Sequence, residues 1–217
     1  MKIKLKCVSD EQLMKVPVKE NNERLVNLRN YNKDLIITIE EESRKVQNLK
    51  DDECFIRESV AIMLSQVQSM LPRGLFLKII DGYRLMEAQK KIYKQVFLEM
   101  KEKFPNLDDK QIEKETDKFV ANPKIIPPHT TGGAVDLTIV DENLKELNFG
   151  TKVNEISEKS ATKFPFESEE VKRNRKLLNK IMKKAGFVNY PLEWWHWSFG
   201  DRIWGFYKKK TSIYNSL

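Results

Sequence analysis

The sequence predicts an α+β fold in which a central, largely antiparallel sheet is flanked by helices. Segments with apolar residues at helical spacing share the chain with short runs of β-branched residues. These segments do not follow the regular β–α–β spacing of a parallel sheet. The chain has 217 residues, about the size of one domain, so we expect residues 1–217 to form a single domain.

The first half of the chain contains two expected strands and two expected helices. Residues 34–40 and 75–80 are apolar and β-branched, which predicts strands. Residues 53–71 carry apolar side chains at helical spacing, and a proline and a glycine follow that would end the helix. A second helix is expected over residues 85–103, with Gln89 among the residues on its inner face.

The second half begins with a charged stretch and ends in a tryptophan-rich strand. Residues 101–118 predict a short exposed helix that starts near Asp108. The alternation over residues 134–140 predicts a strand with one apolar face and one polar face. A long loop is expected over residues 142–166. A helix then starts at Ser168 and ends at Gly186, and a strand is expected over residues 192–199.

Composition excludes several classes of protein. Hydrophobic residues make up 40% of the chain and charged residues 33%, which suits a folded domain rather than a disordered one. No apolar run approaches the ~20 residues that span a bilayer, so we expect no membrane partner. The net charge is +7. Because no basic motif of a nucleic-acid-binding fold is present, we interpret this charge as a lysine-rich solvated surface and expect no nucleic-acid partner.

The N-terminus and the cysteines suggest a reducing compartment. The lysine-containing segment 2–6 is not followed by the ~7–15 apolar residues of a secretory signal. Cys7 and Cys54 are the only cysteines, and they form no CxxC motif. They predict neither a disulfide framework nor a thiolate metal site, and we expect a cytoplasmic protein.

Three candidate metal ligands lie in two short segments. The chain has only two histidines, His129 and His196, and Asp136 follows the first of them on the polar face of the expected strand. A catalytic zinc ion commonly takes three His or carboxylate ligands and keeps one position for water. The alternative is that His196 is an ordinary core residue of an aromatic strand. A buried Asp136 would still need a partner.

Two further residues are candidates for chemistry. Residues three apart in a strand face opposite sides, so we expect Glu193 at the end of a turn and His196 inside the strand. Glu193 could then act as a general base without being a ligand. Arg84 follows an expected strand and could bind a substrate carboxylate or an oxyanion. Its alternative role is a surface ion pair with Glu87.

Three motifs together resemble a known family. They are DGYR at 81–84, PHTTGGAVDLT at 128–138 and EWWHW at 193–197. Over roughly residues 54–200 the chain resembles the zinc D-alanyl-D-alanine dipeptidases, which include the vancomycin-resistance dipeptidases and belong to the zinc D,D-peptidases. The resemblance implies that residues 1–217 form a single zinc D,D-peptidase domain that hydrolyses D-Ala-D-Ala or a related small dipeptide.

The resemblance also implies residue roles. One zinc ion per chain would be held by His129, Asp136 and His196. Glu193 would activate water and later pass a proton to the leaving amine. Arg84 would steady the developing oxyanion.

The chain departs from the family pattern near the substrate. The loop over residues 149–154 usually ends in an aspartate that helps to hold the substrate's ammonium group, and here Asn154 stands at that position. Serines that precede the first metal histidine in vancomycin-resistance members are replaced by Pro127 and Pro128. Because a carboxylate recognises an ammonium group by charge, Asn154 implies a looser requirement for a free amino terminus.

Two other functions stay open. One is a D,D-carboxypeptidase or murein endopeptidase that acts on larger cell-wall peptides. The other is a basic binding module without turnover, which the presence of Glu193 disfavours because a structural zinc site needs no free base. Residues 1–53 and 101–118 carry little functional signal, and the oligomeric state is left open.

Overall fold

The computed structural model describes residues 8–39, 41–50, 53–155 and 157–217. The helices are α1 (Asp10–Met14), α2 (Glu41–Gln47), α3 (Glu58–Ser69), α4 (Met86–Lys103), α5 (Asp109–Thr116), α6 (Glu169–Ala185) and α7 (Arg202–Lys208). The strands are β1 (Leu25–Asn27), β2 (Ile36–Ile37), β3 (Phe55–Arg57), β4 (Leu75–Asp81), β5 (Ala134–Asp141), β6 (Val188–Asn189) and β7 (His196–Ser198). Cys7 and Glu40, which carried expectations from the sequence, lie outside the described residues.

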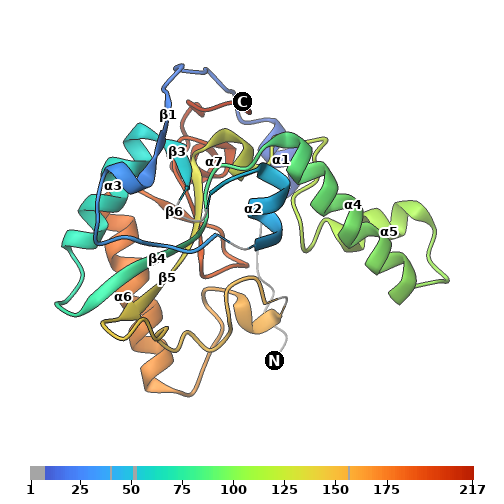
Figure 1. Ribbon diagram of the computed structural model, residues 1–217. Coiled ribbons are helices and arrows are strands. Elements are labelled where there is room, and N and C mark those ends of the chain that lie inside the picture. The colour runs from blue at the N-terminus through green and yellow to red at the C-terminus, as the bar shows by residue number, and fades with distance from the viewer. Residues whose placement is uncertain (1–7, 40, 51–52, 156) are drawn as a thin grey trace.

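The main sheet has the strand order β2-β4-β5-β7-β6 within the described part of the chain. The β2–β4 pair is parallel, and the other neighbouring pairs are antiparallel. Strands β1 and β3 form a separate antiparallel pair. Helices α3 and α6 lie together on one side of the sheet, whereas α4 and α5 extend away from the body (Figure 1). The predicted α+β class with a largely antiparallel sheet is confirmed.

Strand β5 has one face in the core and one face at the functional site. Its apolar face contributes Val135, Leu137 and Ile139 to a core that also contains residues of α3 and α6. Its other face carries Asp136, which is 5% exposed. Residues 134–140 of β5 are all buried, so both faces of the strand are covered, and a carboxylate there requires a partner.

Several helices and strands are shorter than the sequence predicted. The helix expected over residues 53–71 begins only at Glu58, because residues 55–57 pair with β1. An apolar run of this kind satisfies both helix and strand patterns, so periodicity alone could not separate them. The strand expected over residues 34–40 pairs with β4 only at Ile36–Ile37. The strand expected over residues 192–199 is likewise reduced to His196–Ser198.

Other boundaries follow the predicted signals. Asp108 caps α5 in a reciprocal capping box with Gln111. Ser168 caps α6, and Gly186 ends it with φ 108°, a left-handed conformation that glycine adopts readily. In the described ranges, no helix has both the length and the apolar character that crossing a membrane would demand.

Arg175 is expected to be a major contributor to stability. This side chain of α6 is 7% exposed and donates to the carbonyl oxygens of Phe149, Ala161 and Lys159 at 2.8, 2.5 and 2.9 Å. Arg175→Leu would leave these carbonyls unsatisfied, at ~1–3 kcal/mol for each group that stays buried. We expect urea unfolding to show a loss of about 3 kcal/mol. Lys176→Leu, at an exposed position, should change stability by less than ~0.5 kcal/mol, and equal losses in both variants would contradict this account.

Candidate metal centre

His129 lies in a short 3₁₀ turn, η2 (Pro128–Thr131), just before β5. Its Nδ1 is 2.8 Å from the carbonyl oxygen of Gly82. A carbonyl can only accept, so Nδ1 donates this hydrogen bond and Nε2 is the ring nitrogen that a metal ion could use. That Nε2 lies 3.4 Å from Oδ2 of Asp136. The backbone of one motif therefore orients the imidazole of another, as is usual for metal-ligating histidines.

Asp136 and His196 are brought together by strand register. The two residues are direct partners in the antiparallel β5–β7 pair. Oδ1 of Asp136 is 2.9 Å from Nδ1 of His196. The opposite ring nitrogen of His196, Nε2, lies 3.4 Å from Oγ of Ser198. His196 thus presents Nδ1 to the cluster, whereas His129 presents Nε2.

Two glycines let the turn fold back onto the sheet. Gly132 has φ 69°, which ends η2 in a left-handed conformation. A Cβ on Gly133 would lie 2.3 Å from the carbonyl oxygen of Phe199. A larger residue at Gly133 would therefore push the start of β5 away from Phe199, the residue that follows β7.

The three side chains form a compact donor set. One ligand atom from each of His129, Asp136 and His196 lies within 4.8 Å of the others, and all three residues are buried. Two ligands on one tetrahedral zinc ion are ~3.3 Å apart when each metal–ligand distance is ~2.0–2.1 Å. The two contacts to Asp136, at 2.9 and 3.4 Å, lie near this value, so the donor set fits a divalent ion with nitrogen and carboxylate ligands.

Electrostatics keep the carboxylate of this set ionised. Burial alone would raise the pKa of Asp136, but the two imidazoles hold it below its usual range. Burial alone would lower the pKa of His196, yet Asp136 and Glu193 raise it to about 9. The neighbours of each buried group thus stabilise its ionised form. A bound cation would take the place of the proton on His196.

Glu193 lies beside the donor set. Its backbone N–H donates to the carbonyl oxygen of Tyr190 at 3.1 Å, which places Glu193 in a turn, while His196 begins β7. This is the placement that their spacing predicts. Oε2 of Glu193 is 3.9 Å from Nδ1 of His196. Burial raises the pKa of Glu193 to about 7, although Arg84 and the two histidines oppose this shift.

Arg84 reaches the same region from the segment after β4. Its backbone N–H donates to the carbonyl oxygen of His129 at 3.1 Å. Its guanidinium group contacts Asp81 through Nη2 and donates from Nη1 to Oε1 of Gln89 at 2.8 Å. The ion pair with Glu87, which the sequence left as an alternative, is replaced by the ion pair with Asp81.

The loop that contains Asn154 lies against the turn of Glu193. Phe149 stacks on Trp194 with ring centroids 4.2 Å apart, and Oγ1 of Thr151 accepts a hydrogen bond from Nε1 of Trp194 at 2.9 Å. Asn154 is exposed and has φ 62°. The structure thus brings the loop to the neighbourhood of the centre, with the Asn154 side chain at the surface.

Sequence reasoning missed the residues that support the ligands. Ser198 lies behind His196. Buried Asp201, which caps α7 by accepting the N–H of Trp204 at 2.8 Å, contributes to the raised pKa of His196. The carbonyl of Gly82 carries no sequence signal, because every residue has one. Gln89 did carry a signal, since a polar residue on the inner face of a helix requires hydrogen-bond partners.

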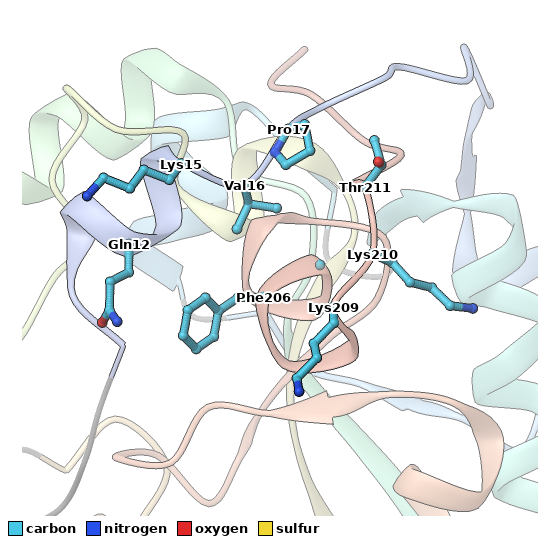
Figure 2. A pocket seen from close by; sticks show the side chains of 9 residues that line it. Gln12, Lys15, Val16, Pro17, Phe206, Lys209, Lys210 and Thr211 are labelled. Atoms are coloured by element: carbon cyan, nitrogen blue, oxygen red, sulfur yellow. The ribbon is translucent and has the colours of Figure 1, made fainter.

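A groove between α1 and α7 lies apart from this centre. It is lined by Gln12, Lys15, Val16, Pro17, Gly205, Phe206, Lys209, Lys210 and Thr211, none of which belongs to the donor set. Figure 2 shows its three lysine side chains pointing in different directions. Ligand sites normally have convergent polar groups, so the candidate chemistry stays with the His–Asp–His cluster.

The chain is similar to known proteins over most of its length. Residues 35–216 match the family described as D-ala-D-ala dipeptidase. A D-alanyl-D-alanine dipeptidase of Synechocystis sp. is 38% identical over 94 residues, which are 38% of this chain and 38% of that protein. One of Escherichia coli is 29% identical over 140 residues, which are 64% of this chain and 63% of that protein. The alignments therefore span less than two thirds of either relative.

The structural similarity is more distant. The solved structure of VanYB in complex with D-alanine-D-alanine covers 74% of this chain and 82% of its own, with 18% identity and a TM-score of 0.45. The family match, by contrast, extends over most of the 217 residues and includes His129, Asp136, Glu193 and His196. The chain belongs to the D-ala-D-ala dipeptidase family.

Proposed function

We propose that this chain is a zinc-dependent D-alanyl-D-alanine dipeptidase that hydrolyses D-Ala-D-Ala or a related small dipeptide. The observation that carries the proposal is the convergence of His129, Asp136 and His196 beside Glu193 in a member of this family. Family membership supports the substrate class, and the donor set supports the metal.

One zinc ion per chain would be held by Nε2 of His129, the carboxylate of Asp136 and Nδ1 of His196. Two imidazoles and one carboxylate are a common donor set for catalytic zinc and leave a fourth position open. When bound, zinc polarises the scissile carbonyl and makes water a stronger acid near neutral pH.

Glu193 and Arg84 would supply the remaining chemistry. Oε2 of Glu193 takes a proton from the attacking water and then donates it to the nitrogen of the leaving amino acid. The guanidinium N–H groups of Arg84 stabilise the negative charge that develops on the carbonyl oxygen. The short distance between Glu193 and His196 supports a base that acts beside the metal ligands.

A dipeptide screen tests the proposal. Zinc-loaded protein is incubated with D,D-, L,D- and L,L-dipeptides, and metal content is measured in parallel. We expect one zinc per chain and hydrolysis of D-Ala-D-Ala that a chelator abolishes and added zinc restores. Loaded protein that hydrolyses no D,D-dipeptide would disprove the proposal, and a steeply salt-dependent affinity for nucleic acid would favour a binding module instead.

Arg84→Ala is expected to lower kcat by about 10²–10³-fold, because a preorganised oxyanion donor is lost. Zinc content should stay at the wild-type value, since Arg84 contributes no atom to the donor set. Arg73→Ala, at an exposed arginine, is the matched control and should keep full activity. Loss of zinc from Arg84→Ala would show that the arginine holds the site together rather than stabilising charge.

Asn154 is expected to relax the preference for a free amino terminus. We expect N-acetyl-D-Ala-D-Ala to be hydrolysed within about 10-fold of D-Ala-D-Ala, a difference of ~1.4 kcal/mol or less. Asn154→Asp should raise the preference for the free amine by about 2–5-fold, the range of an exposed ion pair. Steady-state kcat/KM on both substrates measures this. A preference for the free amine of several hundred-fold in the wild type would contradict the prediction.

The same comparison separates the rival activity on larger cell-wall peptides. A D,D-carboxypeptidase or murein endopeptidase would prefer the acylated substrate.

We further propose a cytoplasmic location. The buried free thiol of Cys54 supports it, because unpaired cysteines are typical of reducing compartments.

A further inference from the structure

Gln89 is a buried polar side chain with no role in the reaction described above. It lies in the first turn of α4 and is 1% exposed. Its amide oxygen accepts a hydrogen bond from Nη1 of Arg84 at 2.8 Å, and its amide nitrogen donates to the carbonyl oxygen of Ala121 at 2.8 Å. Burying an amide costs free energy unless its polar atoms are paired, so this position depends on both contacts.

Arg84 is held from two sides by Gln89 and Asp81. Asp81 contacts Nη2, and its other carboxylate oxygen accepts the N–H of Gly82 at 2.9 Å, so this anchor is itself fixed in the turn. A guanidinium group held at one nitrogen can still pivot about that contact. A second anchor at Nη1 fixes the plane of the group and the direction of its remaining N–H donors.

We infer that Gln89 is a positioning residue for the peptidase reaction: it holds the guanidinium group of Arg84 in the orientation that receives the developing oxyanion. The inference rests on the proposed function, because it requires Arg84 to act on the reacting carbonyl. Donors that are oriented before the reaction stabilise charge without reorganisation, and a displacement of ~1 Å can cost ~10² in rate.

The contact with Ala121 extends this support to the projecting helices. Ala121 follows α5, and α4 and α5 together extend away from the sheet in Figure 1. Gln89 therefore links Arg84 to the base of the α4–α5 pair. A purely structural role for Gln89 would be to hold this pair in place, so the experiment must separate the two roles.

A double-mutant cycle makes this separation. Gln89→Met keeps the length of the side chain and removes both hydrogen bonds. In the wild-type background we expect kcat/KM for D-Ala-D-Ala to fall by about 10–100-fold, mainly through kcat, with unchanged zinc content. In the Arg84→Ala background the same substitution should change kcat/KM by less than about 3-fold, because residues that act as a unit are not additive.

Two further measurements complete the design. Gln95→Met, at an exposed glutamine of the same helix, is the matched control and should keep wild-type activity. Binding of a phosphinate analogue of D-Ala-D-Ala, which imitates the tetrahedral state, should weaken in Gln89→Met by about the factor lost from kcat/KM. Affinity for the product D-alanine should be unchanged.

Each failure has a distinct signature. Equal losses from Gln89→Met in both backgrounds, or no loss in the wild-type background, would overturn the inference and leave the proposed function intact. Wild-type protein that hydrolyses no D,D-dipeptide would disprove the proposed function itself. If Gln89→Met does not fold, Gln89→Glu keeps an oxygen for Arg84 and should stay within about 10-fold of wild type. A loss as large as that of Arg84→Ala would then overturn the inference.

Discussion

Glu193→Gln is expected to lower kcat for D-Ala-D-Ala by about 10²–10⁴-fold, the usual contribution of a general base. The amide keeps the shape of the side chain but cannot accept a proton from water. Because Glu193 lies 3.9 Å from Nδ1 of His196 and outside the three-residue donor set, zinc content should remain one per chain. Steady-state assays measure kcat, and metal analysis of the same samples measures the zinc content.

Glu167→Gln is the matched control for this substitution. Glu167 is exposed in the loop before α6, so its variant should retain wild-type kcat and zinc content. Retention of full activity by Glu193→Gln would remove the general base from the proposed mechanism. Loss of zinc from Glu193→Gln would instead identify Glu193 as a ligand.

Asp136→Asn is expected to abolish stable zinc binding and, with it, hydrolysis. The carboxylate lies 2.9 Å from Nδ1 of His196 and 3.4 Å from Nε2 of His129, so it is the anionic ligand between the two imidazoles. Disturbing groups that only orient a ligand already costs ~10–100-fold in metal affinity, so loss of the ligand should cost at least ~10²-fold. Metal titration measures this change directly.

Thermal unfolding gives a second readout that does not depend on activity. A ligand present at 100 times its Kd stabilises the native state by ~2.7 kcal/mol, so zinc should raise the Tm of the wild type. The Tm of Asp136→Asn should respond much less at the same zinc concentration. Asp34→Asn, at an exposed position, should behave as the wild type does. An equal zinc response in Asp136→Asn would place the metal elsewhere.

Most helices and the central strand were predictable because their signals are local. The strand over residues 134–140 and the helix between Ser168 and Gly186 follow from alternation and capping chemistry. The start of α3 was not predictable, because residues 55–57 become a strand only by pairing with β1, about thirty residues earlier. The partner of Arg84 was not predictable either. Arg84 precedes the first turn of α4, so helical spacing to Glu87 does not apply.

The residue types of the centre are a property of the sequence: two histidines, one aspartate in an apolar strand and one glutamate before the second histidine. Their chemistry predicts a divalent-metal site with a general base beside it. Only the tertiary structure decided which atoms face one another. The Gly82 carbonyl binds Nδ1 of His129, so Nε2 faces Asp136, and strand register brings Nδ1 of His196 to the same carboxylate. Ring orientation depends on backbone groups distant in the chain, which no local pattern encodes.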